Sequence, residues 1–456
     1  MKSVIICNME GVIVNLNKDA EKLFGYQNSE LIGKKRVSIF SHGEIVLQNV
    51  LMWLKKANQD GVYETKTNFI KKDGTVFNAK IRITPNFSNG KNNPQTGYCG
   101  MTELIEEKVS IPITFSTKII KGVAITRAGF CSASLLPVLA VSAYFAGKGD
   151  NLFSIYSLII TLAGILTLQL FSNLFNDYFD VKDGTDGLNE EYFNVGLNDK
   201  FLEGAQISGG SRAIELGLTT LDKTKSLGKI MLGLSFLSVI FILGLSYVNT
   251  GSFENLKFIC LIGLLGGLLG YFYTASPIRL VARNGLGELT IFLTFGPLLT
   301  LGSGYAISNE TIPYLSNEFI NLILLGVPLG LLTTNILFIN QFPDYKSDKL
   351  AAKNNLVVLF GKKISRWIYL FFLVLTFIFM FLFADTLSEN IIGFSYNWYY
   401  LSLLFLLLIG ILIFNHLYKN YSSRALIKSN INTIYFQMIF SIIYILILNP
   451  FYLIFF

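Results

Sequence analysis

Nine apolar stretches, each long enough to cross a lipid bilayer, follow one another after residue 110. They lie at about 123–147, 153–176, 227–248, 256–275, 288–307, 317–341, 365–385, 396–418 and 431–455. A helix can cross a bilayer because it satisfies all of its own backbone hydrogen bonds. The chain of 456 residues is 52% hydrophobic and 15% charged, but the part before residue 110 is mixed and polar. The sequence therefore predicts a multi-domain protein, with a separate N-terminal domain followed by an all-α membrane domain of nine spanning helices.

The N-terminal part has the turn and cap signals of a small α+β domain over residues 1–104. Asn17 suits the start of a helix over 18–24, and Gly25 suits its end. The pair Asp73-Gly74 is typical of a hairpin turn. The strands that we expect around these signals are Val4–Cys7, Val12–Leu16, Tyr63–Lys71, Val76–Thr84 and Gly97–Met101.

Two stretches of this domain resemble a PAS domain. They read GVIVNLNKDAEKLFGYQNSELIGK (Gly11–Lys34) and FIKKDGTVFNAKIRIT (Phe69–Thr84). The resemblance implies a sensory or dimerising module, and with it a PAS-mediated homodimer. Residues 105–121 are expected to be a linker to the membrane domain at 122–456, with a helix around Glu103–Lys108 that Pro112 interrupts.

The formal net charge of +7 arises mainly from loops that fall on one side of the predicted spans. By the positive-inside rule, that side is cytoplasmic in a multi-pass protein of the cell (inner or plasma) membrane. The N-terminal domain is then cytoplasmic and the C-terminus lies outside. The charge is a topology signal and does not indicate nucleic-acid binding. The basic residues concerned are Lys182, Lys200, Arg212, Lys223, Lys225, Lys229, Arg279, Arg283, Lys346, Lys349, Lys353, Lys362, Lys363, Arg366, Lys419, Arg424 and Lys428.

Two acidic clusters follow the second and the sixth span, both on the predicted cytoplasmic side. Carboxylates are costly at the end of a lipid-embedded helix, so they mark a functional site. In the first cluster Asn173, Asn176, Asp177 and Asp180 share one helical face; in the second Asn340, Asp344 and Asp348 recur at steps of four, with Pro343 weakening the helix. Oxygen ligands in this pattern suit Mg²⁺, which joins a few carboxylates to substrate phosphates.

Residues 112–456 resemble the UbiA superfamily of intramembrane prenyltransferases, and within it the 1,4-dihydroxy-2-naphthoate prenyltransferases of menaquinone synthesis. Four stretches carry the resemblance: NDYFDVKDGTD, SGGSRAIELGLTT, YTASPIRLVARNGLGELTIFLTFGPLLTLGS and NQFPDYKSDKLAAKNNLVVLFG. The resemblance implies that Mg²⁺ is the cofactor and that a prenyl group passes from a polyprenyl pyrophosphate to an aromatic acceptor.

The resemblance also implies roles for particular residues. Asp177, Asp180 and Asp186 would hold one Mg²⁺, and Asp344 and Asp348 another; Asn176 and Asn340 would bind or orient these groups. Arg212 and Lys353 are candidates for direct phosphate contact. The chain departs from the common family pattern in two places. Gly184 stands where a third carboxylate is usual, with Asp183 and Asp186 on either side, and Ala352 stands where a glycine is frequent.

Several alternatives remain open at the level of sequence. The acceptor could be homogentisate, a chlorophyll precursor or an archaeal glycerol ether. The acidic clusters could also bind a cation in a membrane transporter or receptor, although charges grouped at one face beside basic residues suit a phosphate site better. Glu288, at the start of a span, could cap that helix or touch the aromatic substrate. Arg279 and Arg283 have no assigned role.

Overall fold

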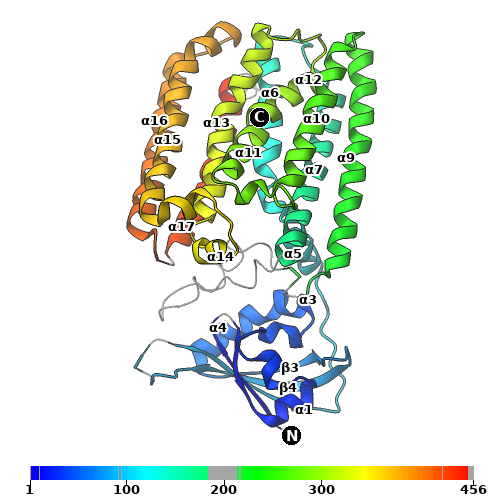
Figure 1. The fold of residues 1–456 in the computed structure, drawn as a ribbon, viewed down its shortest axis with the longest axis vertical. Helices are drawn as coiled ribbons and strands as arrows, with labels where there is room; N and C mark the ends of the chain where they lie inside the picture. Colours follow the sequence, from blue (N-terminus) through cyan, green and yellow to red (C-terminus); the bar gives the residue numbers. More distant parts are fainter. Residues whose placement is uncertain are drawn as a thin grey trace. The chain divides into compact units, whose positions relative to one another are not determined.

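The computed structural model describes residues 2–9, 11–90, 92–93, 95–182, 213–214, 217–423 and 425–449. It contains two compact units, one over residues 1–126 and 190–223 and one over residues 127–189 and 224–456. A sheet with helices forms the first unit, and the second is helical in the part that the structure describes (Figure 1).

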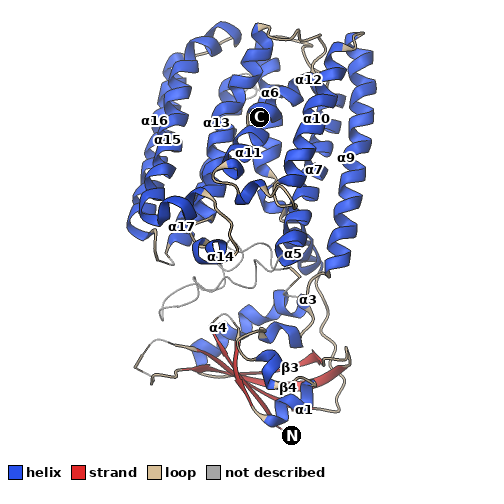
Figure 2. Cartoon of the chain, in the orientation of Figure 1, coloured by secondary structure: helices blue, strands red, loops and turns tan. Residues whose placement is uncertain are grey.

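The first unit is built on a five-stranded antiparallel sheet with strand order β2-β1-β5-β4-β3 (Figure 2). The strands are β1 Lys2–Asn8, β2 Ile13–Leu16, β3 Tyr63–Ile70, β4 Val76–Asn86 and β5 Gly97–Leu104. The helical segments are α1 Lys18–Phe24, α2 Asn28–Leu31, η1 Val37–Phe40, α3 Gly43–Ile45, η2 Val46–Val50, α4 Leu51–Asp60 and α5 Phe115–Thr126.

Local signals in the sequence explain the elements of this unit. The Asn17 side chain accepts a hydrogen bond from the Ala20 backbone N–H at 2.9 Å, and Gly25 ends α1 in the left-handed conformation. In the β3–β4 turn Asp73 Oδ1 accepts from the Thr75 N–H at 2.8 Å. The predicted α+β domain, including its five strands, is confirmed.

The linker differs from the expectation. Strand β5 runs to Leu104, no helix follows until α5 begins at Phe115, and the helix expected around Glu103–Lys108 is therefore wrong. Glu103 is already paired with Lys2 and Lys80 in the sheet register, so the chain stays extended there. The segment instead packs on the first unit through Gln48.

Gln48 and Glu44 hold α5 against the rest of the first unit. The Gln48 side chain donates to the Pro112 carbonyl at 3.1 Å and accepts from the Thr117 hydroxyl at 2.9 Å. Lys121 forms an ion pair with Glu44 at 2.5 Å. Burial alone would raise the pKa of Glu44, but the hydrogen bond from Lys121 leaves that pKa below its usual range.

The second unit is a bundle of helices that run side by side (Figure 1). Within its described residues, nine segments are long and apolar enough to cross a membrane, which confirms the predicted number of spans. The helical segments are η3 Ala128–Phe130, α6 Ser132–Lys148, α7 Ile155–Lys182, α9 Leu221–Thr250, α10 Glu254–Phe272, η5 Leu280–Ala282, α11 Leu286–Phe295, α12 Pro297–Ile307, α13 Asn317–Asn340, α14 Tyr345–Leu350, α15 Leu356–Asn390, α16 Tyr396–Asn420 and α17 Leu426–Leu448.

Helix α13 lies at the centre of this bundle, against α6, α11, α12, α15 and α17. The fifth span is broken where α11 ends and α12 begins, because Pro297 cannot donate a backbone hydrogen bond. A Cβ on Gly296 at this break would lie 2.6 Å from the Gly326 carbonyl oxygen of α13. Glycine therefore allows the break to pack directly against the central helix.

Helices α7 and α13 begin at the same end of the bundle. The loop before α7 pairs with the loop after α12: the Ser154 N–H donates to the Ile307 carbonyl at 2.8 Å, and the Asn309 N–H donates to the Leu152 carbonyl at 3.0 Å. Helix α13 starts a few residues further on. The C-terminal ends of α7 and α13, which carry the two acidic clusters, therefore lie together at the opposite end.

Candidate functional site

The first acidic cluster lies on the last turns of α7. This helix continues to Lys182, so Asn173, Asn176, Asp177 and Asp180 share one helical face, as predicted. Asp177 is only 4% exposed and forms an ion pair with Arg127 at 3.5 Å. The Asn176 side-chain oxygen accepts from the Thr274 hydroxyl at 2.8 Å.

The second acidic cluster does not continue its helix. Helix α13 ends at Asn340 and the short helix α14 begins at Tyr345, so the prediction that Asn340, Asp344 and Asp348 share one face of a helix is wrong. Pro343 has no N–H to extend the α13 hydrogen-bond ladder, and the chain turns there. Asn340 remains at the end of α13, where its side-chain oxygen accepts from Asn430 of α17 at 2.9 Å.

Lys353 joins the two clusters. Its Nζ lies 3.2 Å from Asp180 Oδ1 on α7 and 3.8 Å from Asp348 Oδ1 on α14. Asn355 begins α15 and also donates to Asp348 Oδ2, at 2.7 Å. Two motifs that are far apart in the sequence thus form one largely buried cluster with a cation between them.

The carboxylates of this cluster repel one another. Burial is the largest cause that raises the pKa of Asp348; Lys353 opposes it, the charges of Asp344 and Asp180 add to it, and the net pKa is about 7. Burial alone would lower the pKa of Lys353, but the three carboxylates raise it above the usual range. The cluster therefore favours additional positive charge.

The carboxylates of the two clusters could supply part of the coordination sphere of Mg²⁺. The described residues contain no group of three or more His, Cys, Asp or Glu side chains placed to hold a metal by themselves. Mg²⁺ commonly needs only one or two carboxylates when substrate phosphates and water complete its shell. Asp177, Asp180, Asp344 and Asp348 could supply such oxygens. Asp183, Asp186 and Arg212 lie outside the described residues.

Four further residues hold this site, and the sequence analysis did not select them. Arg127 contacts Asp177, Thr274 contacts Asn176, Asn355 contacts Asp348, and Asn430 contacts Asn340. Arg127, Thr274 and Asn430 are each far along the chain from their partners, whereas Asn355 lies only seven residues after Asp348. A single Arg or Asn at the end of a spanning helix carries no signal that distinguishes it from an ordinary interfacial residue.

Arg279 and Arg283, to which the sequence assigned no role, differ in their structural setting. Arg283 donates to the carbonyls of Ile278 and Pro277, at 2.8 and 3.1 Å, so it holds the loop between α10 and α11. Arg279 precedes η5 in the left-handed backbone region, with a φ of 47°.

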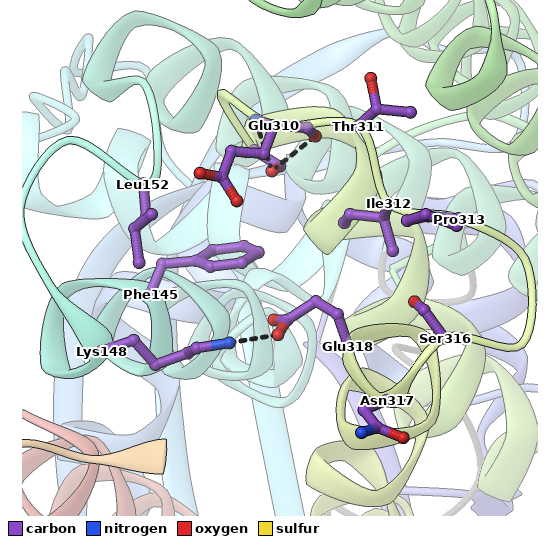
Figure 3. A pocket seen from close by; sticks show the side chains of 11 residues that line it. Phe145, Lys148, Leu152, Glu310, Thr311, Ile312, Pro313, Ser316, Asn317 and Glu318 are labelled. Atoms are coloured by element: carbon purple, nitrogen blue, oxygen red, sulfur yellow. Dashed lines mark hydrogen bonds and ion pairs between the residues drawn. The ribbon is translucent and has the colours of Figure 1, made fainter.

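A cavity of about 280 Å³ lies at the other end of the bundle (Figure 3). It is lined by the end of α6, the loop after α12 and the start of α13, and its polar residues include Lys148 and Glu318, which form an ion pair. The 24 residues of α13 separate this cavity from the acidic clusters by about 36 Å, at 1.5 Å per helical residue. It is therefore distinct from the candidate site.

Comparison with known proteins assigns both parts of the chain. Residues 222–442 match the UbiA prenyltransferase family and residues 1–103 match a PAS domain. The 1,4-dihydroxy-2-naphthoate octaprenyltransferase of Bacillus subtilis (strain 168) is 29% identical over 52% of this chain and 65% of that protein. The Escherichia coli (strain K12) protein of the same name is 31% identical over 49% of this chain and 62% of its own length. The chain thus spans less than two thirds of either relative.

A solved structure is also similar in part. A UbiA homologue from Archaeoglobus fulgidus bound to GPP and Mg²⁺ is 18% identical, with a TM-score of 0.46, over 71% of this chain and 99% of that chain.

Proposed function

Because residues 222–442 belong to the UbiA prenyltransferase family and residues 1–103 are a PAS domain, we propose that the protein transfers a prenyl group from a polyprenyl pyrophosphate to an aromatic acceptor. The observation that carries the proposal is Lys353, whose ammonium group lies between Asp180 of the first cluster and Asp348 of the second. A pyrophosphate needs cations around it, and this position has both a fixed cation and carboxylates that can hold more.

In the proposed reaction the allylic carbon–oxygen bond of the prenyl pyrophosphate breaks, and the pyrophosphate leaves with the electron pair. Mg²⁺, when bound, neutralises the charge that develops on this leaving group. Asp177, Asp180, Asp344 and Asp348 would hold the metal, and Lys353 would contact the phosphate directly. The allylic carbon then forms a bond to an electron-rich ring carbon of the acceptor, which loses its own substituent.

We propose 1,4-dihydroxy-2-naphthoate as the acceptor, as in menaquinone synthesis. The name that the bacterial relatives share supports this choice. The stretches Ser208–Thr220 and Tyr273–Ser303 support it as well, through their resemblance to the naphthoate branch. In that branch the ring carbon loses carbon dioxide as the new bond forms.

The full-length protein in lipid nanodiscs, with Mg²⁺ and a set of prenyl pyrophosphates, tests this proposal. Dihydroxynaphthoate, homogentisate, a chlorophyll precursor and a glycerol-ether acceptor should be offered separately, and the products weighed by mass spectrometry. We expect a prenylated naphthalenediol that has lost the mass of carbon dioxide. If only another acceptor gives a product, that compound is the acceptor and the naphthoate assignment is wrong. If no acceptor gives a product, the transporter or receptor alternative is favoured.

We further propose a cytoplasmic PAS domain that regulates or dimerises the enzyme, in a multi-pass protein of the cell membrane. The basic loops support this orientation. Asp177, Asp180, Asp344, Asp348 and Lys353, which are proposed for the chemistry, lie in the second unit, so the PAS domain is not expected to contribute to catalysis.

A further inference from the structure

Three buried polar atoms near the acidic clusters have no hydrogen-bond partner among the residues that the structure describes. They are the Glu288 carboxylate oxygen Oε2, the Gln341 amide oxygen and the Tyr273 hydroxyl. Their residues are 2%, 5% and 8% exposed. A buried polar group without a partner is unfavourable by about 1–3 kcal/mol, so several such groups together require an explanation.

Glu288 does not cap its own helix. Gly285 is the N-cap of α11, and no side chain caps that helix end. Instead Glu288 Oε1 accepts two hydrogen bonds from other helices: one from the Gln341 side chain at 2.9 Å and one from the Leu356 N–H at 3.0 Å. These bonds fix the carboxylate between α11, the end of α13 and the start of α15. They use one of its oxygens and leave the other available.

Tyr273 belongs to the same region. Its carbonyl accepts from the Val281 N–H at 2.9 Å, and a Cβ on Gly287 would lie 2.9 Å from the Val281 Cα, so the start of α11 packs directly on this segment. Burial raises the pKa of Tyr273 well above its usual range, and the charges of Glu288, Asp180 and Asp348 add to this. The hydroxyl therefore lies within the electrostatic reach of both Glu288 and the acidic clusters.

We propose that Glu288 and Tyr273 are the polar anchors that bind the aromatic acceptor. A ring hydroxyl of the acceptor donates to Glu288 Oε2, and the Tyr273 hydroxyl donates to a second oxygen on the acceptor. This inference rests on the proposed function, because it concerns the second substrate of that reaction. It selects acceptors whose ring carries a hydroxyl group.

The choice of a carboxylate has a chemical reason. A hydrogen bond from a ring hydroxyl to a carboxylate is charge-assisted and shifts electron density towards the ring. The ring must be electron-rich to attack the allylic carbon. Because Gln341 and Leu356 hold the other oxygen, the carboxylate is oriented before the acceptor arrives, and little conformational entropy is lost on binding.

The test compares Glu288→Gln and Tyr273→Phe with wild type in nanodiscs, using dihydroxynaphthoate and its two monomethyl ethers. Glu254→Gln is the matched control, since Glu254 is also an acidic first-turn residue of a spanning helix. For each variant the KM of the acceptor and the KM of the prenyl pyrophosphate are measured separately. We expect Glu288→Gln to raise the acceptor KM about 10-fold to 100-fold, the value of one charge-assisted hydrogen bond, with the pyrophosphate KM unchanged.

The methyl ethers separate direct contact from a structural role. Wild type should discriminate strongly against one ether, and Glu288→Gln should lose that discrimination; a structural defect would weaken all three acceptors alike and overturn the proposal. If Glu288→Gln does not fold, Tyr273→Phe decides, because it removes only an unpartnered hydroxyl. Should wild type prenylate while both variants keep the acceptor KM within about twofold, only this inference is wrong. If wild type prenylates no acceptor, the proposed function fails as well.

Discussion

Replacing Lys353 by methionine should destabilise the membrane unit, because it leaves the largely buried carboxylates of the two clusters facing one another. The Lys353 ammonium lies 3.2 Å from Asp180 and 3.8 Å from Asp348. At an effective dielectric constant of 20 these distances correspond to gross attractions of about 5 and about 4 kcal/mol. Desolvation of the lysine offsets much of this, and breaking a buried ion pair typically costs about 3–5 kcal/mol.

The cost should depend on pH in a defined direction. Without Lys353 the pKa of Asp348 rises above its already elevated value of about 7, because the lysine is the charge that lowers it. The folded variant then binds a proton that the unfolded chain releases at lower pH, so its stability falls as pH rises through and above 7. We expect a loss of about 3 kcal/mol or more at pH 8 and a smaller loss at pH 6.

Equilibrium unfolding in mixed micelles without added Mg²⁺ measures both effects, followed by fluorescence or circular dichroism. Lys349→Met is the control, since Lys349 is an exposed lysine in the same region. The double variant Lys353→Met/Asp180→Asn should recover a coupling energy of about 1.5 kcal/mol or more. If the two single changes add to within about 0.5 kcal/mol, Lys353 and Asp180 do not interact in the folded protein and the joining of the two clusters is wrong.

Three further predictions concern topology, the PAS domain and the linker. Reporters placed after Asp150 and after Ser388 should be external. Reporters near Lys349 and near Asn198, which lies outside the described residues, should be cytoplasmic. Finding the Asp150 and Asn198 reporters on the same side of the membrane would contradict the order of the spans. A truncated chain that begins near Ser110 should still prenylate, with a changed rate or without a ligand response; complete loss of activity in a well-folded truncation would show that the PAS domain helps to build the site. Since the pKa of Glu44 is lowered from 4.5, the Lys121 pair should contribute stability above that pH and lose it as pH falls further. The protection of α5 amides from hydrogen exchange, corrected for the intrinsic exchange rate at each pH, should therefore fall in acid for wild type but not for Glu44→Gln. An equal fall in both proteins would refute the pair.

Features set by short-range chemistry could be predicted from the sequence. Asn17, Gly25 and the Asp73-Gly74 turn each act within a few residues, and the structure places their elements as expected. The nine spans found among the described residues follow from apolar length alone. Two predicted helices were wrong. The helix expected to continue through Pro343 ends in a turn, and the helix expected around Glu103–Lys108 is displaced by strand pairing at Glu103.

The contacts of the candidate site could not be predicted in this way. Lys353 and Asp180 are 173 residues apart, and Glu288 and Leu356 are 68 residues apart, so no periodicity connects them. The sequence allowed two roles for Glu288, a helix cap or a contact with the aromatic substrate. Neither role predicted its hydrogen bond with the start of α15. The proposed roles of the aspartates, of Asn176 and Asn340, and of Lys353 stay predictions, as do those of Asp186 and Arg212.

The most direct test of the central claim is prenyl transfer by Asp180→Ala and by Asp344→Ala at saturating Mg²⁺. Asp180→Ala removes a carboxylate from the first acidic cluster, and Asp344→Ala removes one from the second. We expect both to lose turnover while they remain folded and inserted in the membrane, and we expect chelation of Mg²⁺ to abolish turnover in wild type. Wild-type turnover in either variant would contradict a single site built from the two clusters.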